Sequence, residues 1–250
     1  MKTLFLLLGL LLSTAYAQEL TVAAAADLRP ALDAITPGFE ATSGIKLRVS
    51  YGSSGNFYQQ LQNGAPFDVF LSANLEYPKK LESAGFVAPN SYYEFARGSI
   101  VVMVAANSKL DLKPGLRALL DPSVRKIAIA DPSHAPYGQA AVAALKSEGL
   151  YDQVAPKLVA GENISQAASF VLSGAADAGI VAKSLAMAPS AASQVRFVEV
   201  PRGDYPPMMQ AMVVLKSSKE QPAAERFESY VRSPEAGKVL QQYGFEIPEK

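Results

Sequence analysis

The first half of the chain alternates between short apolar segments and segments with helical spacing. Residues 20–25 are apolar, residues 45–50 alternate apolar with polar positions, and residues 28–39 between them carry apolar side chains at helical intervals. This pattern predicts a strand, a helix and a second strand. Pro37 and Gly38 interrupt the helical pattern, so we expect this helix to be kinked or to end early.

The same alternation continues to about residue 85. A helix is expected after the second strand, ending before Gly64, and it is followed by a buried strand at 68–72 and a helix at 77–84. Strands that alternate with helices predict a mostly parallel sheet flanked by helices. Ligands bind at the carboxyl ends of strands in such sheets, which is where Asp27 and Ser54 lie.

The second half repeats this design and then returns to the first. Residues 92–106 are extended and apolar except around Gly98, which we place near a hinge, and residues 208–215 form a second long apolar strand. We expect one lobe from 18–98 plus 209–250 and another from 99–208, with a cleft between them. Further elements are predicted as strands at 126–130, 157–160 and 178–182 and helices at 139–148, 165–173, 223–231 and 234–242.

Residues 1–17 are typical of a cleavable secretory signal. Lys2 supplies the positive start, residues 4–12 are apolar but too few to span a bilayer, and residues 15–17 read Ala-Tyr-Ala, a small-x-small cleavage site. The chain contains no Cys, so neither a disulfide nor a lipid-anchoring cysteine is expected. These features predict a periplasmic protein.

Charge and composition argue against several functions. The chain has 23 basic and 23 acidic residues, and loss of Lys2 with the signal would leave one acid in excess. A nucleic acid partner would need a basic face. One His and no Cys do not readily supply a metalloenzyme site, and Gly52-Ser53-Ser54-Gly55 does not fit the Gly-x-Ser-x-Gly spacing of a serine hydrolase. We therefore predict no catalytic residues and no cofactor.

Three turns between a strand and a helix share one design. The first is at 51–56, with Ser53 and Ser54 at the start of a helix, and the others are at 131–139 and 161–166. The first backbone N–H groups of a helix have no partner within it and carry the positive end of the helix dipole, so each turn is suited to an anion. The alternative for the first turn is that its serines only cap the helix.

Several motifs together resemble the periplasmic molybdate-binding proteins of ABC importers. They are Gly-Ser-Ser-Gly-Asn-Phe-Tyr at 52–58, Gln-Asn-Gly-Ala-Pro-Phe-Asp-Val-Phe-Leu-Ser-Ala at 62–73, Ala-Arg-Gly at 96–98, Asp-Pro-Ser-His-Ala-Pro-Tyr-Gly at 131–138 and Tyr-Gly-Phe at 243–245. The resemblance implies an α/β, two-lobed periplasmic binding protein fold of type II. It also implies that molybdate or tungstate is held in the cleft by neutral donors.

The resemblance places five ligand positions on this chain. It implies that Ser54 offers its hydroxyl and backbone N–H, Tyr137 its phenol, and Ile164 its backbone N–H, with Ala26 and Asp27 as the first-loop positions. These residues would contact the oxygens of the oxyanion, and none would be a direct ligand of the metal. His134, the single histidine, is expected to be a structural hydrogen-bonding residue.

Asp27 departs from the family pattern, which usually has a neutral donor in this loop. A carboxylate beside a dianion is repulsive. In one interpretation Asp27 turns away and caps its own helix, so that only its backbone N–H faces the ligand. In the other, Asp27 accepts a hydrogen bond from a protonated anion or helps to hold a cation, and the ligand is then not molybdate.

The resemblance predicts a binding protein rather than an enzyme. We expect it to be a monomer that captures molybdate, and tungstate as well, and delivers it to a membrane permease. The alternative is a receptor for sulfate, phosphate or an organic anion on the same fold.

Overall fold

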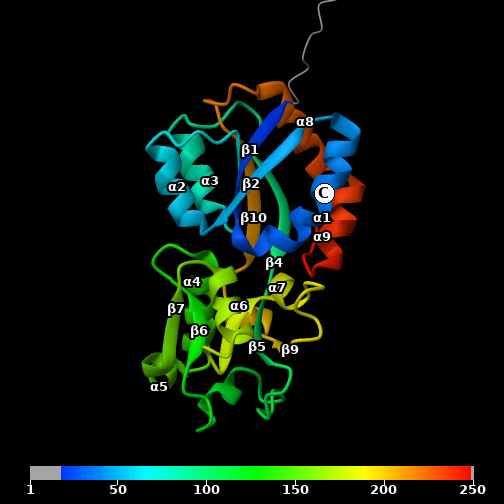
Figure 1. The fold of residues 1–250 in the computed structure, drawn as a ribbon. Coiled ribbons are helices and arrows are strands. Elements are labelled where there is room, and N and C mark those ends of the chain that lie inside the picture. Colours follow the sequence, from blue (N-terminus) through cyan, green and yellow to red (C-terminus); the bar gives the residue numbers. More distant parts are fainter. Residues whose placement is uncertain (1–17, 249–250) are drawn as a thin grey trace, which may run out of the picture.

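The computed structural model describes residues 18–248, which form two lobes stacked along one long axis (Figure 1). The expected signal at 1–17 lies outside the described residues. The first lobe contains a five-stranded sheet in the order β2-β1-β3-β10-β4, and the second a five-stranded sheet in the order β7-β6-β8-β5-β9. We propose 18–98 with 209–250 and 99–208 as the boundaries of these lobes.

In each sheet four strands run in one direction and one runs against them. In the first lobe β10 is antiparallel to both of its neighbours, β3 and β4, and in the second lobe β5 is antiparallel to β8 and β9. The remaining pairs are parallel. The strands are β1 Glu19–Ala25, β2 Lys46–Gly52, β3 Val69–Ser72, β4 Tyr93–Gly98, β5 Ile100–Ala105, β6 Ile127–Ala130, β7 Leu158–Gly161, β8 Ala178–Ala182, β9 Val195–Glu199 and β10 Met208–Val214.

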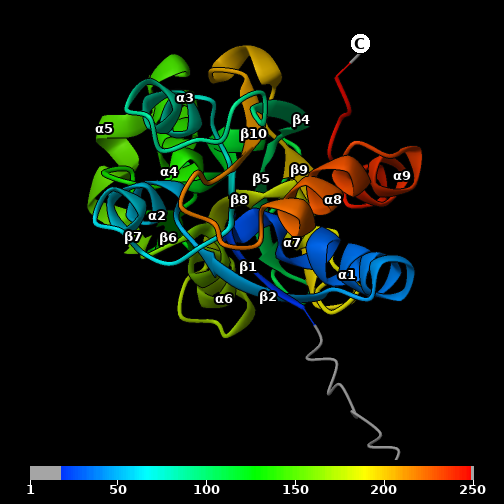
Figure 2. The same ribbon diagram turned by 90° about the horizontal axis from the view of Figure 1, so that it is seen from above.

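Helices cover both faces of the first sheet, with α2 and α3 on one side and α1, α8 and α9 on the other (Figure 2). In the second lobe α4 and α6 pack on the strands. The α-helices are α1 Arg29–Ser43, α2 Ser54–Gln62, α3 Glu76–Ser83, α4 Pro136–Ser147, α5 Tyr151–Val154, α6 Ile164–Leu172, α7 Lys183–Ala186, α8 Gln221–Val231 and α9 Pro234–Gln242. Short 3₁₀ turns are η1 Ala26–Leu28, η2 Gly115–Leu120, η3 Ala155–Lys157 and η4 Arg202–Asp204.

Helix α1 continues through Pro37 to Ser43, so the predicted early end is wrong. Proline costs the helix one hydrogen bond, but burial of the apolar face opposes that cost. Phe39, beyond the proline, packs edge-on against Phe227 and Tyr230 of α8, with ring centroids 5.2 and 5.6 Å apart. Burying such a ring contributes about 1.5–3 kcal/mol, which favours continuation of the helix.

The segment predicted as one long extended run at 92–106 consists of two strands in different sheets. Strand β4 ends at Gly98 in the first lobe, and β5 starts at Ile100 in the second. Strand β10 leads back, since its first residue, Met208, pairs with Gly98. The chain therefore crosses between the lobes at neighbouring places, which is the arrangement of a hinge.

Asp68 fixes the start of β3 against two other segments. Its Oδ2 accepts hydrogen bonds of 2.7 Å from the backbone N–H and from the hydroxyl of Thr21, and its Oδ1 accepts one of 2.6 Å from Ser218. The carboxylate thus fastens β1 and the segment after β10 to β3. This anchoring holds the strands whose carboxyl ends face the second lobe.

Candidate functional site: a cavity between the lobes

A small cavity lies where the carboxyl ends of the first-lobe strands meet the helix starts of the second lobe. All five of the predicted ligand positions line it. The lining consists of Ala25, Ala26, Asp27, Gly52, Ser53, Ser54, Ala73, Ala135, Pro136, Tyr137 and Ile164. Folding therefore gathers these positions, which are far apart in the sequence, around one space, while their role in binding stays a prediction.

The Ser54 hydroxyl is free to donate a hydrogen bond into the cavity. Ser53 caps α2 by accepting a hydrogen bond from the backbone N–H of Asn56, so Ser54 is the first helical residue. The buried Ser54 Oγ accepts a 2.9 Å hydrogen bond from the backbone N–H of Ala73. A hydroxyl has two lone pairs and one proton. Its proton therefore remains available to an acceptor in the cavity.

Two helices of the second lobe also begin at the cavity. Helix α6 starts at Ile164. The Asn163 side chain caps it by accepting hydrogen bonds of 3.0 and 3.1 Å from the backbone N–H groups of Ser165 and Gln166. Helix α4 starts at Pro136, and Tyr137 follows it. With α2, three helix starts meet here. Pro136 has no N–H and Gly55 donates to His134, so the first-turn N–H groups left without a partner in their own helix are those of Ser54, Tyr137 and Ile164. The cavity therefore presents neutral donors and positive dipole ends, which suit an anion.

Asp27 does not cap its helix, so that interpretation is wrong: neither η1 nor α1 has a side-chain cap. The carboxylate instead accepts hydrogen bonds at Oδ2 from the Tyr137 hydroxyl, at 2.9 Å, and from Gln210 Nε2, at 2.6 Å. The physical reason is that η1 passes straight into α1, and donors from the second lobe and from β10 reach the carboxylate. Gln210 was missed, although a polar residue in the otherwise apolar strand β10 is a signal that could have found it.

The buried setting of Asp27 changes its acidity. The side chain is fully buried, and this burial raises the pKa of the carboxyl from 3.8 to about 6, while the hydrogen bonds from Gln210 and Tyr137 act in the opposite direction. Burial and the nearby carboxylate hold the pKa of the Tyr137 phenol well above its usual value. Both effects favour the neutral forms of these groups.

His134 joins the lobes beside the cavity. Its backbone carbonyl accepts a 2.9 Å hydrogen bond from the N–H of Gly55, and its Nδ1 lies 2.8 Å from the Oγ of Ser53. Asp131 approaches the other ring nitrogen at 3.7 Å. Each contact with Gly55 and Ser53 crosses from the second lobe to the first, so His134 acts as a structural link between them.

Two serines of the second lobe bind the carbonyls of the first loop. Ser165 donates to the carbonyl oxygen of Ala26 at 3.0 Å, and Ser184 donates to that of Asp27 at 2.7 Å. Together with the link at His134, these bonds close the lobes around the cavity. A ligand held there would be enclosed by both lobes.

A family model described as "Bacterial extracellular solute-binding protein" matches residues 20–246. The match includes every element of both lobes except the first residue of β1. The chain belongs to this family. It is therefore a substrate-binding protein of the kind that serves transport.

Molybdate-binding proteins that match nearly the whole chain are among its relatives. The molybdate-binding protein ModA of Rhodobacter capsulatus is 37% identical over 242 residues, which cover 97% of this chain and 93% of that protein. The structure of the periplasmic molybdate-binding protein of Azotobacter vinelandii superimposes with a TM-score of 0.87 at 34% identity, covering 92% of this chain and 100% of that one. These comparisons agree with the type II fold and with the resemblance found in the sequence.

The fold alone does not decide the ligand of such a solute-binding protein. The sulfate-binding protein SubI of Mycobacterium tuberculosis has a TM-score of 0.77 at 20% identity, covering 93% of this chain and 88% of that one. At this identity the likeness concerns architecture only. The choice of anion has to be argued from the cavity.

The hinge of this solute-binding protein is braced by the C-terminal segment. Backbone hydrogen bonds of 2.7 and 2.9 Å join Arg97 of β4 to Glu246. The Glu246 carboxylate also pairs with Arg202 of the second lobe. The acid at the C-terminal end thus contacts both lobes beside the crossover.

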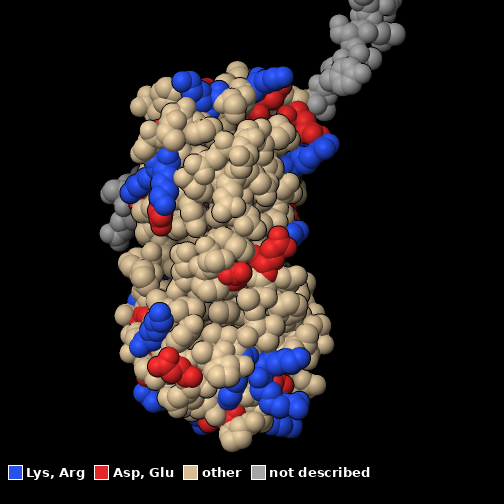
Figure 3. Space-filling model, turned by 90° about the vertical axis from the view of Figure 1, so that its left-hand side faces the viewer, with Lys and Arg blue, Asp and Glu red and all other residues tan. Residues whose placement is uncertain are grey.

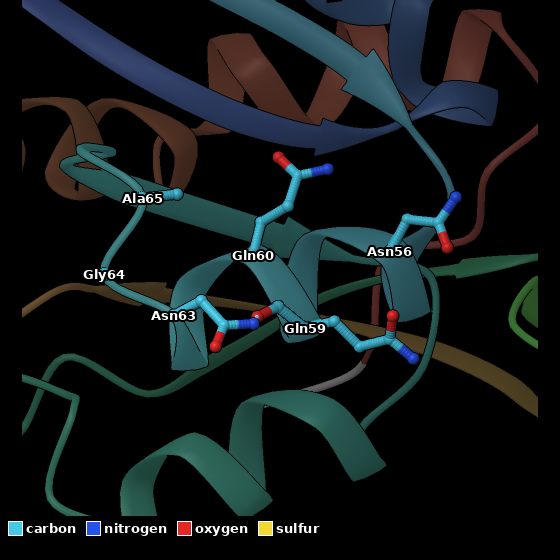
Figure 4. A pocket seen from close by; sticks show the side chains of 6 residues that line it. All are labelled: Asn56, Gln59, Gln60, Asn63, Gly64 and Ala65. Carbon is cyan, nitrogen blue, oxygen red and sulfur yellow. Dashed lines mark hydrogen bonds between the residues drawn. The ribbon is translucent and has the colours of Figure 1, made fainter.

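Outside the cleft, the solute-binding protein has a broader hollow on α2 (Figure 4). It is lined by Asn56, Gln59, Gln60, Asn63, Gly64 and Ala65, whose side chains are uncharged and mostly exposed. It offers none of the buried donors found in the cleft. Within residues 18–248 there is also no cluster of three or more potential metal ligands and no helix long and apolar enough to cross a membrane.

Proposed function

We propose that this solute-binding protein captures molybdate in the periplasm and delivers it to the membrane permease of an ABC importer. The observation that carries the proposal is the meeting of Ser54, Tyr137 and Ile164 with three helix starts in one cavity between the lobes. Full-length relatives at 37% identity that are named molybdate-binding proteins support it.

The absence of basic side chains around the cavity fits this ligand. None of the residues that line it is Lys or Arg. Basic and acidic side chains are interspersed over the face shown in Figure 3, so no broad basic field surrounds an approaching anion there. Fully deprotonated molybdate carries only acceptors and matches the donors of Ser54 and Ile164, whereas the hydroxyl of HPO₄²⁻ needs an acceptor such as an ionised Asp27. Sulfate differs mainly in size, so the rigidity of the cavity has to exclude it.

The proposal also covers tungstate binding, the oligomeric state, catalysis and the signal at 1–17. We infer that tungstate binds as well, because it shares the shape and charge of molybdate. The protein acts as a monomer, without a cofactor and without catalysis, and a signal at 1–17 directs it to the periplasm. Ligand capture is a closure of the lobes that is favoured by contacts made only in the closed form.

Calorimetric titration with molybdate, tungstate, sulfate and phosphate at neutral pH tests this function. We expect tight one-to-one binding of molybdate and tungstate and much weaker binding of the other two. Binding of phosphate or sulfate in preference to molybdate would overturn the proposal. It would favour the alternative of a different anion receptor.

Ser54→Ala is expected to weaken molybdate binding by about 1–3 kcal/mol, the range for losing a hydrogen bond to a charged group. The matched control is Ser229→Ala on the exposed face of α8, where the hydroxyl bonds only to a backbone carbonyl of its own helix. Titration of both variants gives the comparison. Equal affinities would show that Ser54 does not donate to the ligand.

A further inference from the structure

The hydrogen bonds around Asp27 leave the cavity one donor short. The Tyr137 hydroxyl gives its proton to Asp27 Oδ2. A phenol has a single proton, so Tyr137 cannot also donate it to a ligand. As long as Asp27 is ionised, the carboxylate and an oxyanion compete for the same proton.

Two atoms of the same cluster have no hydrogen-bond partner among the described residues. They are Asp27 Oδ1 and Gln210 Oε1, and both are shielded from solvent. Buried polar atoms without partners are costly and call for an explanation. Both atoms are acceptors, so what the cluster lacks is a proton.

One added proton gives Gln210 Oε1 a partner and removes the charge that holds the Tyr137 proton, while Asp27 Oδ1 still has no partner among the described residues. If Asp27 is protonated and the Gln210 amide makes half a turn, the carboxyl O–H donates to Gln210 Oε1, since the amide and the carboxyl already lie 2.6 Å apart. The Tyr137 proton is then released to donate into the cavity. The cleft thereby gains a donor and loses its negative charge at the same time.

Among residues 18–248, no neighbouring cation offers another way to neutralise Asp27. On α1, Arg29 lies over the ring of Tyr51, 4.2 Å from its centroid, and on α7, Lys183 pairs with Glu199. Helix α6 and strand β10, which also surround the carboxyl, carry no charged residue. An ionised Asp27 and a dianion would repel each other in this cavity between the lobes.

We propose that Asp27 takes up one proton from solution when the oxyanion binds, so that the protein captures a dianion together with a proton. This inference rests on the proposed function. The raised pKa of the carboxyl, about 6, supports it because little further stabilisation of the neutral form is needed at neutral pH. The proton resides on the Asp27 carboxyl, facing Gln210, and no bond of the anion changes.

The proposal fixes the pH dependence of binding. Well above pH 6 the free protein has an ionised Asp27, and binding must recruit a proton, so the affinity decreases about tenfold for each pH unit. Molybdate is fully deprotonated in this range and contributes no proton of its own. A neutral residue at 27 abolishes this dependence.

The test is calorimetric titration of the mature protein with sodium molybdate in several buffers that differ in ionisation enthalpy. The slope of the observed enthalpy against buffer enthalpy gives the number of protons taken up. We expect about one proton per molybdate at pH values well above 6 and a decreasing affinity as the pH rises. We also expect an infrared difference band of a protonated carboxyl on binding.

Asp27→Asn should abolish the proton uptake, the infrared band and the pH dependence. It should bind more tightly than the natural protein at the highest pH. Asp152→Asn, at an exposed acid on α5, should keep the proton uptake. Tight molybdate binding without proton uptake would overturn the inference and leave the proposed function standing. Failure of molybdate to bind at any pH would overturn both.

Discussion

Replacing Gly55 with alanine is expected to reduce the affinity for molybdate by about 10²–10⁴-fold. A Cβ at this position would lie 2.5 Å from the backbone carbonyl oxygen of His134 and 2.9 Å from its Cβ, which is too close. Because a backbone carbonyl cannot swing aside, the lobes would be held apart. The ligand would lose donors such as Tyr137 and Ile164, about 1.5–3 kcal/mol for each of two hydrogen bonds to a charged group.

Gly55→Ala should impair closure of the lobes and leave folding of the protein unchanged. Gly203→Ala is the matched control, because a Cβ there has no atom within 4 Å. Titration gives the affinities, small-angle scattering with and without molybdate gives the closure, and thermal unfolding checks that the variant is folded. If Gly55→Ala bound molybdate normally and closed on it, the contact between Gly55 and His134 would not belong to the bound form.

Local pattern in the sequence was enough to predict most of the fold. The strand at 20–25 and the helices at 223–231 and 234–242 lie within two residues of β1, α8 and α9. What the pattern missed is short or exposed. Strand β9 is an edge strand with polar outward positions, and α5 and α7 are single turns, so neither carries a full period of apolar side chains.

Some features of the cavity were predicted from the sequence, and others were not. The turn of Ser54 was found because a helix start is readable from its serines, whereas Ile164 was given by the family resemblance. Ser53 and Asn163 do cap α2 and α6. The environment of Asp27 was not readable. Its hydrogen-bond partners, Tyr137 and Gln210, lie 110 and 183 residues away, and no local rule reports such a pairing.

Asp27→Asn is expected to stabilise the ligand-free protein by about 3 kcal/mol above pH 6. The carboxyl has a pKa of 3.8 in an unfolded chain and about 6 in the fold. The folded state therefore binds more protons than the unfolded state between these values, and its stability falls as the pH rises through this window. A pKa shift of about two units corresponds to about 3 kcal/mol of unfolding free energy. The natural protein loses this stability when Asp27 ionises, and the asparagine variant does not.

Urea unfolding of both proteins from about pH 4 to 8, without ligand, measures this difference. Carboxyls with lowered pKa values, such as those of Asp121 and Asp177, give a slope of opposite sign in both proteins and cancel in the comparison. The difference in unfolding free energy should grow from about pH 4 to 6 and then stay constant. A difference that does not change with pH would mean that water reaches Asp27 when no ligand is bound. The lobes would then be open in the free protein, and the burial of Asp27 would be a consequence of closure, not a property of the resting fold.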